Sequence, residues 1–409
     1  MRFRLLRAIF VPTLMLGVGL AIPAFAQSSP ALPPRTDVVV DLAPLPADGQ
    51  QPGNSSLVVF APGKTDGRKL LEVTASEQIE ISPDGKFELV AGGGSDQSSD
   101  SLTYGPIGQK LTPIPVDSEQ HILWSAFSAD GRYLTYTSAS LDSEAWVLGL
   151  LEISSGNRVE FAGDFGDSTK APFPGVGNAV AWSADGKRLF VQNYQPFSAN
   201  GNFDSLYALD ISSIHFDKPG RGAFPSAVPL LKAGEEISNF AISNDGTKLA
   251  VSYTMNAGAS PSAGADQAPP NTVSIRDLNT GSEIMSYSSS AGQSIAYPLN
   301  WTLDGQKLIF ASGVYQDAVF SGNGNLLEAD INTKQVVTIP LATQSADSEY
   351  EDAVVCGDTL FYSTSKASAP DEADTATLYS APLSDLKTAT KLQAAWYINV
   401  IGCVPDTGN

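Results

Sequence analysis

The chain has 409 residues, 24 basic against 44 acidic side chains, and a formal net charge of −20. Nucleic acids and anionic membrane surfaces bind proteins through cationic patches, so this charge argues against both as partners. It permits a basic protein or a cationic ligand, although acidity can also serve only to keep an exported protein soluble. Glycine and proline are abundant (36 and 27 residues) and no long segment has helical apolar periodicity, which predicts the all-β class.

The first 26 residues have the pattern of a signal peptide. Three arginines precede an apolar run from Ala8 to Ala24, which ends in the small-x-small cleavage site Ala24-Phe25-Ala26. A membrane anchor is the alternative, but the run is short for a spanning helix and ends in the cleavage signal. We therefore predict Gln27 as the mature N-terminus, a mature net charge of −23, no membrane span, and a periplasmic or secreted protein.

One hairpin motif recurs along the rest of the chain. Its copies share an apolar residue, then Ser or Thr, one variable residue, and Asp-Gly; they are Ile81–Lys86, Phe127–Arg132, Trp182–Lys187, Ile242–Thr247 and Trp301–Gln306, with a decayed copy at Val355–Asp358. The glycines of the five intact copies are 46, 55, 60 and 59 residues apart, the size of a propeller blade. Asp-Gly between two apolar strands predicts a tight turn, because glycine accepts positive φ and Asp bonds the turn backbone. The residue before Ser is expected to pack between neighbouring sheets.

A second hairpin follows each first one, for example from Asn271 to Tyr287. Two hairpins form a four-stranded antiparallel blade, and several blades around an axis form a β-propeller. The repeated hairpin, followed by a strand such as Leu206–Asp210, resembles the TolB-like or WD40-like (PD40) repeat family. The resemblance implies a propeller but no particular function, since similar repeats occur in peptidase propellers. In place of the α/β domain that precedes the TolB propeller, we predict a Pro-rich tether (residues 27–36) and one propeller domain (residues 37–409).

The two ends of the chain have the pattern of complementary parts of one blade. Ser55–Phe60 and Lys69–Val73 form a predicted outer hairpin, Val38–Leu42 a further strand, and Trp396–Val404 an innermost strand. One blade shared by the N- and C-terminal strands would close the ring and cover its edges, so we favour seven blades over the alternative of six.

The two cysteines lie near this predicted closure. Cys356 and Cys403 are 47 residues apart, close to one repeat, and each ends a predicted innermost strand. An exported protein with two cysteines favours a disulfide, which would tie the closing strand to the last complete blade. Two buried free thiols are the alternative, because equivalent positions in adjacent blades can be too far apart for a bridge.

Loop length distinguishes the two faces of the predicted propeller. Tight turns dominate one face, where Ser212–Ser226 is the large exception, and the other face has the long segments 163–177, 194–203, 254–271, 313–323, 342–351 and 365–375. Long loops on a rigid scaffold commonly bind ligands. The candidate ligand-binding residues on this long-loop face are Tyr194, Phe197, Phe203, Tyr315, Asp317, Phe320, Glu349, Tyr350 and Asp352. Aromatic rings beside carboxylates suit a cationic or carbohydrate ligand, and ordinary solvated loop residues are the alternative at each position.

The sequence contains no Gly-x-Ser-x-Gly, His-Glu-x-x-His, Cys-x-x-Cys or phosphate-loop motif, and its two histidines, His121 and His215, fall on different faces. We therefore predict a non-catalytic, monomeric binding or scaffold propeller of the cell envelope, without a cofactor. Its ligand would be a protein or a small cationic or carbohydrate molecule on the long-loop face. The alternative is a propeller hydrolase or lactonase that uses channel carboxylates, with Ca²⁺ as the metal that Asp-rich loops could hold.

Overall fold

The computed structural model of the chain describes residues 35–45, 54–73, 78–92, 101–117, 120–140, 145–164, 180–192, 206–231, 237–253, 271–290, 293–316, 319–339, 348–366 and 375–406. The chain divides into two compact units, Met1–Ala31 and Leu32–Asn409, and every described residue belongs to the second. In these ranges the secondary structure consists of strands and turns. None of the described segments forms a helix with the length and hydropathy needed to cross a bilayer.

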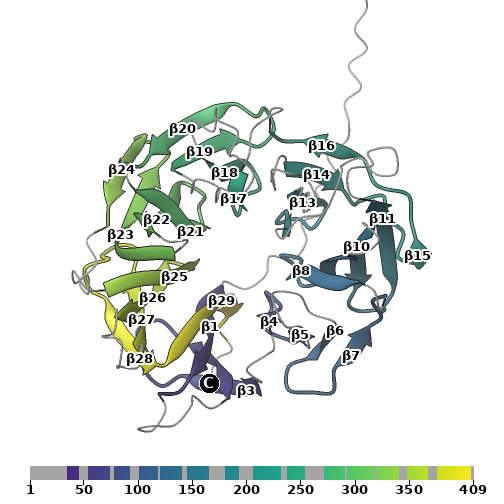
Figure 1. Cartoon of the computed structure of the whole chain (residues 1–409), viewed down its shortest axis with the longest axis horizontal. Helices are drawn as coiled ribbons and strands as arrows, with labels where there is room; N and C mark the ends of the chain where they lie inside the picture. The colour runs from purple at the N-terminus through teal and green to yellow at the C-terminus, as the bar shows by residue number, and fades with distance from the viewer. Residues whose placement is uncertain are drawn as a thin grey trace, which may run out of the picture. The chain divides into compact units, whose positions relative to one another are not determined.

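The strands of the second unit form seven blades, each with four antiparallel strands, arranged around an axis (Figure 1). From the inside outward, blade 1 consists of β29 (Tyr397–Pro405), β1 (Arg35–Ala43), β2 (Ser55–Phe60) and β3 (Arg68–Val73). Blade 2 consists of β4 (Gln78–Ile81), β5 (Phe87–Gly92), β6 (Ser101–Pro106) and β7 (Thr112–Ile114). Blade 3 consists of β8 (His121–Phe127), β9 (Tyr133–Ala139), β10 (Ala145–Glu152) and β11 (Arg158–Asp164), with β15 (Gly220–Arg221) added in parallel at its outer edge.

The remaining four blades follow in chain order. Blade 4 consists of β12 (Val180–Trp182), β13 (Arg188–Gln192), β14 (Leu206–Asp210) and β16 (Ala227–Pro229), and blade 5 of β17 (Ile237–Ile242), β18 (Lys248–Tyr253), β19 (Thr272–Asp277) and β20 (Glu283–Ser288). Blade 6 consists of β21 (Ser294–Trp301), β22 (Lys307–Gln316), β23 (Val319–Asp330) and β24 (Gln335–Thr338), and blade 7 of β25 (Ser348–Cys356), β26 (Thr359–Lys366), β27 (Thr375–Pro382) and β28 (Thr390–Ala395).

Blade 1 combines the two ends of the described chain. Strand β29 pairs antiparallel with β1 in a register that runs from Arg35↔Pro405 to Ala43↔Tyr397. The predicted all-β propeller, its seven blades and its closure by N- and C-terminal strands are therefore confirmed. The ladder gives the innermost strand of blade 1 a partner on its outer side, so the ring closes through ordinary strand pairing.

The apolar core is divided among the interfaces between blades. Seven clusters of buried side chains occur, one at each of the seven interfaces between neighbouring blades. The aromatic residues before the motif serines lie in them, as predicted: Phe127 between blades 2 and 3, Trp182 between blades 3 and 4, and Trp301 between blades 5 and 6. Full burial of such a side chain stabilises the fold by roughly 1.5–3 kcal/mol, so the blades hold one another together.

The Asp-Gly turns have the backbone that the motif predicts. Gly85, Gly131, Gly186, Gly246 and Gly305 have φ between 63° and 70°. In the blade 5 turn, the Asp245 carboxylate accepts the Ser243 hydroxyl at 2.5 Å and the Thr247 amide at 3.0 Å. The Ser243 hydroxyl in turn accepts the Lys248 amide at 2.9 Å. The serine therefore closes the turn together with the aspartate, a role that the sequence pattern alone did not reveal.

Candidate functional site

The motif carboxylates on the turn face are used for structure. Each of them accepts the hydroxyl two residues before it and the amide two residues after it; they are Asp84, Asp130, Asp185, Asp245 and Asp304. At Asp185 and Asp245, burial alone would raise the pKa of the carboxyl, but the hydrogen bonds outweigh it and lower the pKa below its usual value. At Asp304, the Gln306 amide and the Thr302 hydroxyl also lower the pKa of the carboxyl.

These turns also contact one another around the ring. A Cβ built on Gly186 would lie 2.9 Å from Oδ2 of Asp130, and one on Gly305 would lie 3.5 Å from Oδ1 of Asp245. The aspartate of one blade therefore packs against the turn glycine of the next at Gly131, Gly186 and Gly305, whereas Gly246 meets the Arg188 side chain instead. We call these contacts the turn belt, and the motif carboxylates are already engaged there.

The predicted ligand-binding residues fall into three groups. Tyr194, Phe197, Phe203 and Asp317 lie outside the described residues. Tyr315 and Phe320 are not in a loop, as we expected for 313–323, but in β22 and β23, where they occupy directly opposite positions of the ladder. The ladder continues to Gln316↔Val319 because the Gly- and Ser-rich segment pairs across a register shift at Ser312/Val314 instead of leaving the sheet.

Glu349, Tyr350 and Asp352 form the third group. The segment 342–351 was expected to be a loop, but Ser348–Cys356 is the innermost strand of blade 7, so all three residues lie in β25. The Asp352 carboxylate accepts the amide of Val400 in β29 at 3.0 Å and the amide of Ala353 at 2.8 Å. It thereby ties blade 7 to blade 1, which gives it a structural role in the ring.

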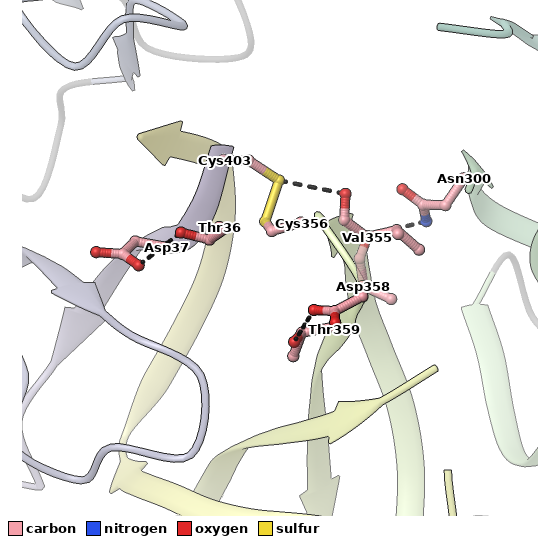
Figure 2. The surroundings of a disulfide bond; sticks show 9 residues. Thr36, Asp37, Asn300, Val355, Cys356, Asp358, Thr359 and Cys403 are labelled. Atoms are coloured by element: carbon pink, nitrogen blue, oxygen red, sulfur yellow. Dashed lines mark hydrogen bonds between the residues drawn. A yellow bond between two sulfur atoms is a disulfide. The ribbon is translucent and has the colours of Figure 1, made fainter. Parts of the chain in front are cut away.

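The two cysteines link the same two blades, and Figure 2 shows their disulfide. Cys356 and Cys403 form a disulfide between β25 and β29, with their Cα atoms 5.5 Å apart. On the other side of β25, the Asn300 side-chain amide donates to the carbonyl of Ala353 at 3.0 Å. Blades 6, 7 and 1 are therefore linked near the axis by covalent and polar contacts.

Among the side chains that the structure describes on the innermost strands, two large aromatic ones are exposed. Trp124 of β8 and Tyr397 of β29 are 42% and 47% exposed. Tyr397 begins β29 and so lies at the strand end opposite the Asp-Gly turns, whereas Trp124 is the middle residue of β8 and follows a bulge after Ile122. We call Trp124 and Tyr397 the axial aromatics. The sequence analysis missed them, because an aromatic residue in a strand normally predicts burial; the bulge that turns Trp124 outward has no sequence signal.

A carboxyl group also lies between two innermost strands. Glu80 of β4 accepts the hydroxyl of Ser125 in β8 at 3.0 Å. Its carboxyl end is enclosed although the residue keeps some surface exposure, and burial raises its pKa to about 8. Among the described residues, no three His, Cys, Asp or Glu side chains gather into a possible metal site.

The fold and these sites define the chain as a seven-bladed β-propeller with a hydrogen-bonded turn face and exposed aromatic residues near the axis. Comparison with protein-family models and with curated proteins gave no match, so the TolB-like resemblance stays a prediction. Solved structures do match. The β-propeller domain of the trilobed protease from Pyrococcus furiosus aligns with a TM-score of 0.52 and 13% identity, over 88% of this chain and 96% of that chain.

Two larger proteases give similar matches. A prolyl endopeptidase aligns with a TM-score of 0.50 and 15% identity, and the tricorn protease with 0.49 and 12%. The matches cover 78% and 83% of this chain but only 42% and 34% of those proteins, so this chain spans less than half of either. At such identities the likeness shows the propeller fold alone. One difference is clear: the Pyrococcus propeller is described as having an open velcro topology, whereas β29 pairs with β1 here.

Proposed function

We propose that this chain is a non-catalytic binding propeller that acts outside the cytoplasm and recognises its ligand at the end of the axis opposite the Asp-Gly turns. The observation that supports this site best is the exposure of the axial aromatics, Trp124 and Tyr397. By contrast, Phe127, Trp182, Phe240 and Trp301 on other innermost-strand positions are buried between blades. Aromatic rings in a chain of net charge −20 suit a cationic ligand, a basic protein segment or a carbohydrate.

Tryptophan fluorescence provides a direct test. Of the five tryptophans, Trp146, Trp182 and Trp301 are at most 8% exposed. Trp124, which is 42% exposed, and the half-buried Trp396 next to Tyr397 should report a ligand at the axis. The protein is titrated with oligolysine and, separately, with neutral oligosaccharides. We expect one class to change the emission of the wild type. Isothermal titration calorimetry, which does not depend on Trp124, should show that Trp124→Ala or Tyr397→Ala weakens its binding by about tenfold.

The matched control is Val337→Ala, because Val337 is 49% exposed but lies on the outermost strand β24 of blade 6. This variant should bind like the wild type. If neither ligand class changes the emission, or if Trp124→Ala and Val337→Ala bind equally well, the proposed site is wrong.

The hydrolase or lactonase alternative has one feature in its favour, the enclosed carboxyl of Glu80 beside Ser125. A carboxylic acid that stays protonated near neutral pH can act as a general acid. Peptide and lactone substrates should be assayed with the wild type and with Glu80→Gln, with and without Ca²⁺. If the wild type turns over a substrate and Glu80→Gln does not, the enzymatic proposal replaces the binding proposal. A rise in melting temperature on addition of Ca²⁺ would show in addition that the protein binds this metal.

The proposed location has its own test. Expressed with its N-terminus intact, the protein should appear in the periplasmic or secreted fraction, cleaved before Gln27 and monomeric in size-exclusion chromatography. Recovery of an uncleaved, membrane-bound chain would contradict this part of the proposal and leave the binding test unaffected.

A further inference from the structure

A segment of blade 4 covers the outer edge of blade 3. We call residues 212–226, between β14 and β16, the strap. Its strand β15 pairs in parallel with β11 through Val159↔Gly220 and Glu160↔Arg221, and the Gly222 amide donates to the Glu160 carbonyl at 2.9 Å. Figure 1 shows β15 at the rim beside β11, far from the axis.

Aromatic contacts fix the strap in place. Phe216 stacks on Tyr133 with ring centroids 5.0 Å apart, and Phe224 packs against Trp146 and Phe161 at 5.5 and 5.4 Å. Such ring pairs contribute roughly 0.5–1.5 kcal/mol beyond the area they bury. The strap is therefore a rigid wall on the rim of the propeller.

This wall borders a groove of about 520 Å³ between the rims of blades 2 and 3. One side is formed by Pro219 and Gly220 of the strap and by the β10–β11 turn around Asn157, and the other side by residues 112–115 at the outer edge of blade 2. Tyr104 lines the groove between them. The volume lies in the range of sites that bind a small molecule or a short peptide segment.

The walls suit an extended proline-containing ligand. Pro113 and Pro115 at the edge of blade 2 and Pro219 in the strap line the groove. Because Pro113 and Pro115 have no amide hydrogen, the outer edge of blade 2 is poorly equipped to accept an added β-strand. Their rings instead offer flat apolar surfaces. Two donors lie among them, the Tyr104 hydroxyl, whose pKa burial raises, and the Arg158 guanidinium, which donates to the Pro115 carbonyl. Grooves that recognise a polyproline II helix are lined by aromatic rings. Here Tyr104 supplies one such ring, and the proline rings supply the remaining flat apolar surface.

The charge around the groove is opposite to that of the whole chain. Arg158 lines the groove, and the exposed Lys218 and Arg221 directly flank its lining residues in the strap. Glu160 lies 3.4 Å from Nε of Arg158, and the exposed Asp217 directly precedes Lys218, so two of these three charges are offset. The one positive charge that remains, in a chain of net charge −20, favours an acidic ligand at this place.

We propose that this rim groove binds an extended, proline-containing acidic peptide segment of a partner protein. The site is separate from the axial aromatics, so the two proposals stand or fall independently. The rings of Pro113, Pro115 and Pro219 contact the prolines of the peptide, the Tyr104 hydroxyl donates to a peptide carbonyl, and the cations of the strap attract its carboxylates.

The test uses a fluorescein-labelled peptide of three Pro-Pro-Glu repeats and fluorescence polarisation against the full mature chain. Peptides of Pro-Pro-Lys and Gly-Gly-Glu repeats separate the contributions of charge and of proline. We expect saturable binding of the acidic proline peptide, weakened by salt, and at least tenfold weaker binding of the other two. Failure of the acidic proline peptide to bind, or equal binding of all three peptides, would overturn the proposal.

Variants then localise the binding. Thr112→Trp fills the groove from an exposed position, Tyr104→Phe removes one hydroxyl, and Lys218→Glu with Arg221→Glu reverses the charge of the strap. We expect losses of about 30-fold, threefold and tenfold in affinity, respectively. Tyr379→Phe and Lys387→Glu with Lys391→Glu make the matched changes on blade 7 and should leave binding unchanged, with melting temperatures recorded for every variant.

Other occupants would give other results. If the labelled peptide binds a folded Thr112→Trp variant as well as it binds the wild type, the rim groove is not its site. If the wild type instead forms a dimer that Thr112→Trp abolishes, the groove contacts a second copy of the chain, and the peptide proposal is overturned.

Discussion

Blades 5 and 1 have the same four antiparallel strands but are assembled from the chain in different ways. Blade 5 is contiguous from Ile237 to Ser288, and the Ser243–Asp245 turn joins its inner two strands locally. Blade 1 takes its innermost strand β29 from the far end of the chain, so no turn joins β29 to β1. A disulfide to Cys356 and a hydrogen bond to Asp352 hold β29 instead. Because no local turn joins β29 to β1, these long-range links offset the entropy cost of closing the ring.

Among the changes that test this difference between blades 5 and 1, removal of the disulfide should lower the stability of the protein most. Cys356→Ala with Cys403→Ala opens a loop of 47 residues, for which chain entropy predicts a loss of about 4 kcal/mol in the free energy of unfolding. Urea denaturation measures this, and the reduced wild type serves as the matched control. A double variant within 1 kcal/mol of the oxidised wild type would show that strand pairing alone closes the ring.

The second-largest loss of stability is expected when the packing between turns of neighbouring blades is disturbed. Gly186→Ala places a Cβ at φ +67° and 2.9 Å from the Asp130 carboxylate, whereas Gly281→Ala places one at φ +69° with nothing within 4 Å. Backbone strain costs each variant about 1–2 kcal/mol, and the contact should cost Gly186→Ala about 1 kcal/mol more. Thermal unfolding compares the two directly. Equal losses would mean that Asp130 moves aside freely and that the turn belt contributes nothing between blades.

A smaller loss of stability is expected when the hydrogen bond between Asp352 of blade 7 and the Val400 amide of blade 1 is removed. Asp352→Ala leaves the Val400 amide without its acceptor and should lower the free energy of unfolding by about 2 kcal/mol. Asn239 is the matched residue of blade 5, where its Oδ1 accepts the amide of its own neighbour Phe240. Asn239→Ala should cost about 0.5 kcal/mol. If both variants lose the same amount, Asp352 is no more important to the closure than a local cap is to blade 5.

The smallest effect concerns acid stability. Hydrogen bonds lower the pKa of Asp245 in the folded state, so its contribution is complete above the unfolded pKa of about 4 and is lost as the pH falls toward the folded value. Asp245→Asn should flatten this part of the stability–pH curve by less than about 1 kcal/mol, because the side chain is partly exposed. The exposed Asp66→Asn is the control. A curve for Asp245→Asn that follows the wild type down to pH 2 would contradict the role of the charge.

Some of the site could not have been found from the pattern of residues. Alternation counted from the buried Ile122 predicts that Trp124 is buried, and the shift of register after Ile122 reverses this and exposes it. Tyr315 and Phe320 were assigned to a loop because they fall in the long segment 313–323 between predicted strands, yet strand pairing extends to Gln316↔Val319. In both cases the pairing with a neighbouring strand determines the exposure or the secondary structure of the residue. The register of that pairing cannot be read from a single sequence.

The sequence by itself determined the blade. Ser, Asp and Gly at fixed spacing specify a turn through hydrogen bonds within six residues, and a Trp, Phe or Ile before the serine specifies the apolar edge. Such local chemistry repeats wherever the motif repeats, which is why blade number, closure and the proximity of the cysteines followed from it. The tertiary structure alone decided how the strap seats Phe216 and Phe224 against blade 3 and so builds a groove on the rim. That contact joins segments about 80 residues apart by non-directional apolar packing, which leaves no fixed spacing in a sequence.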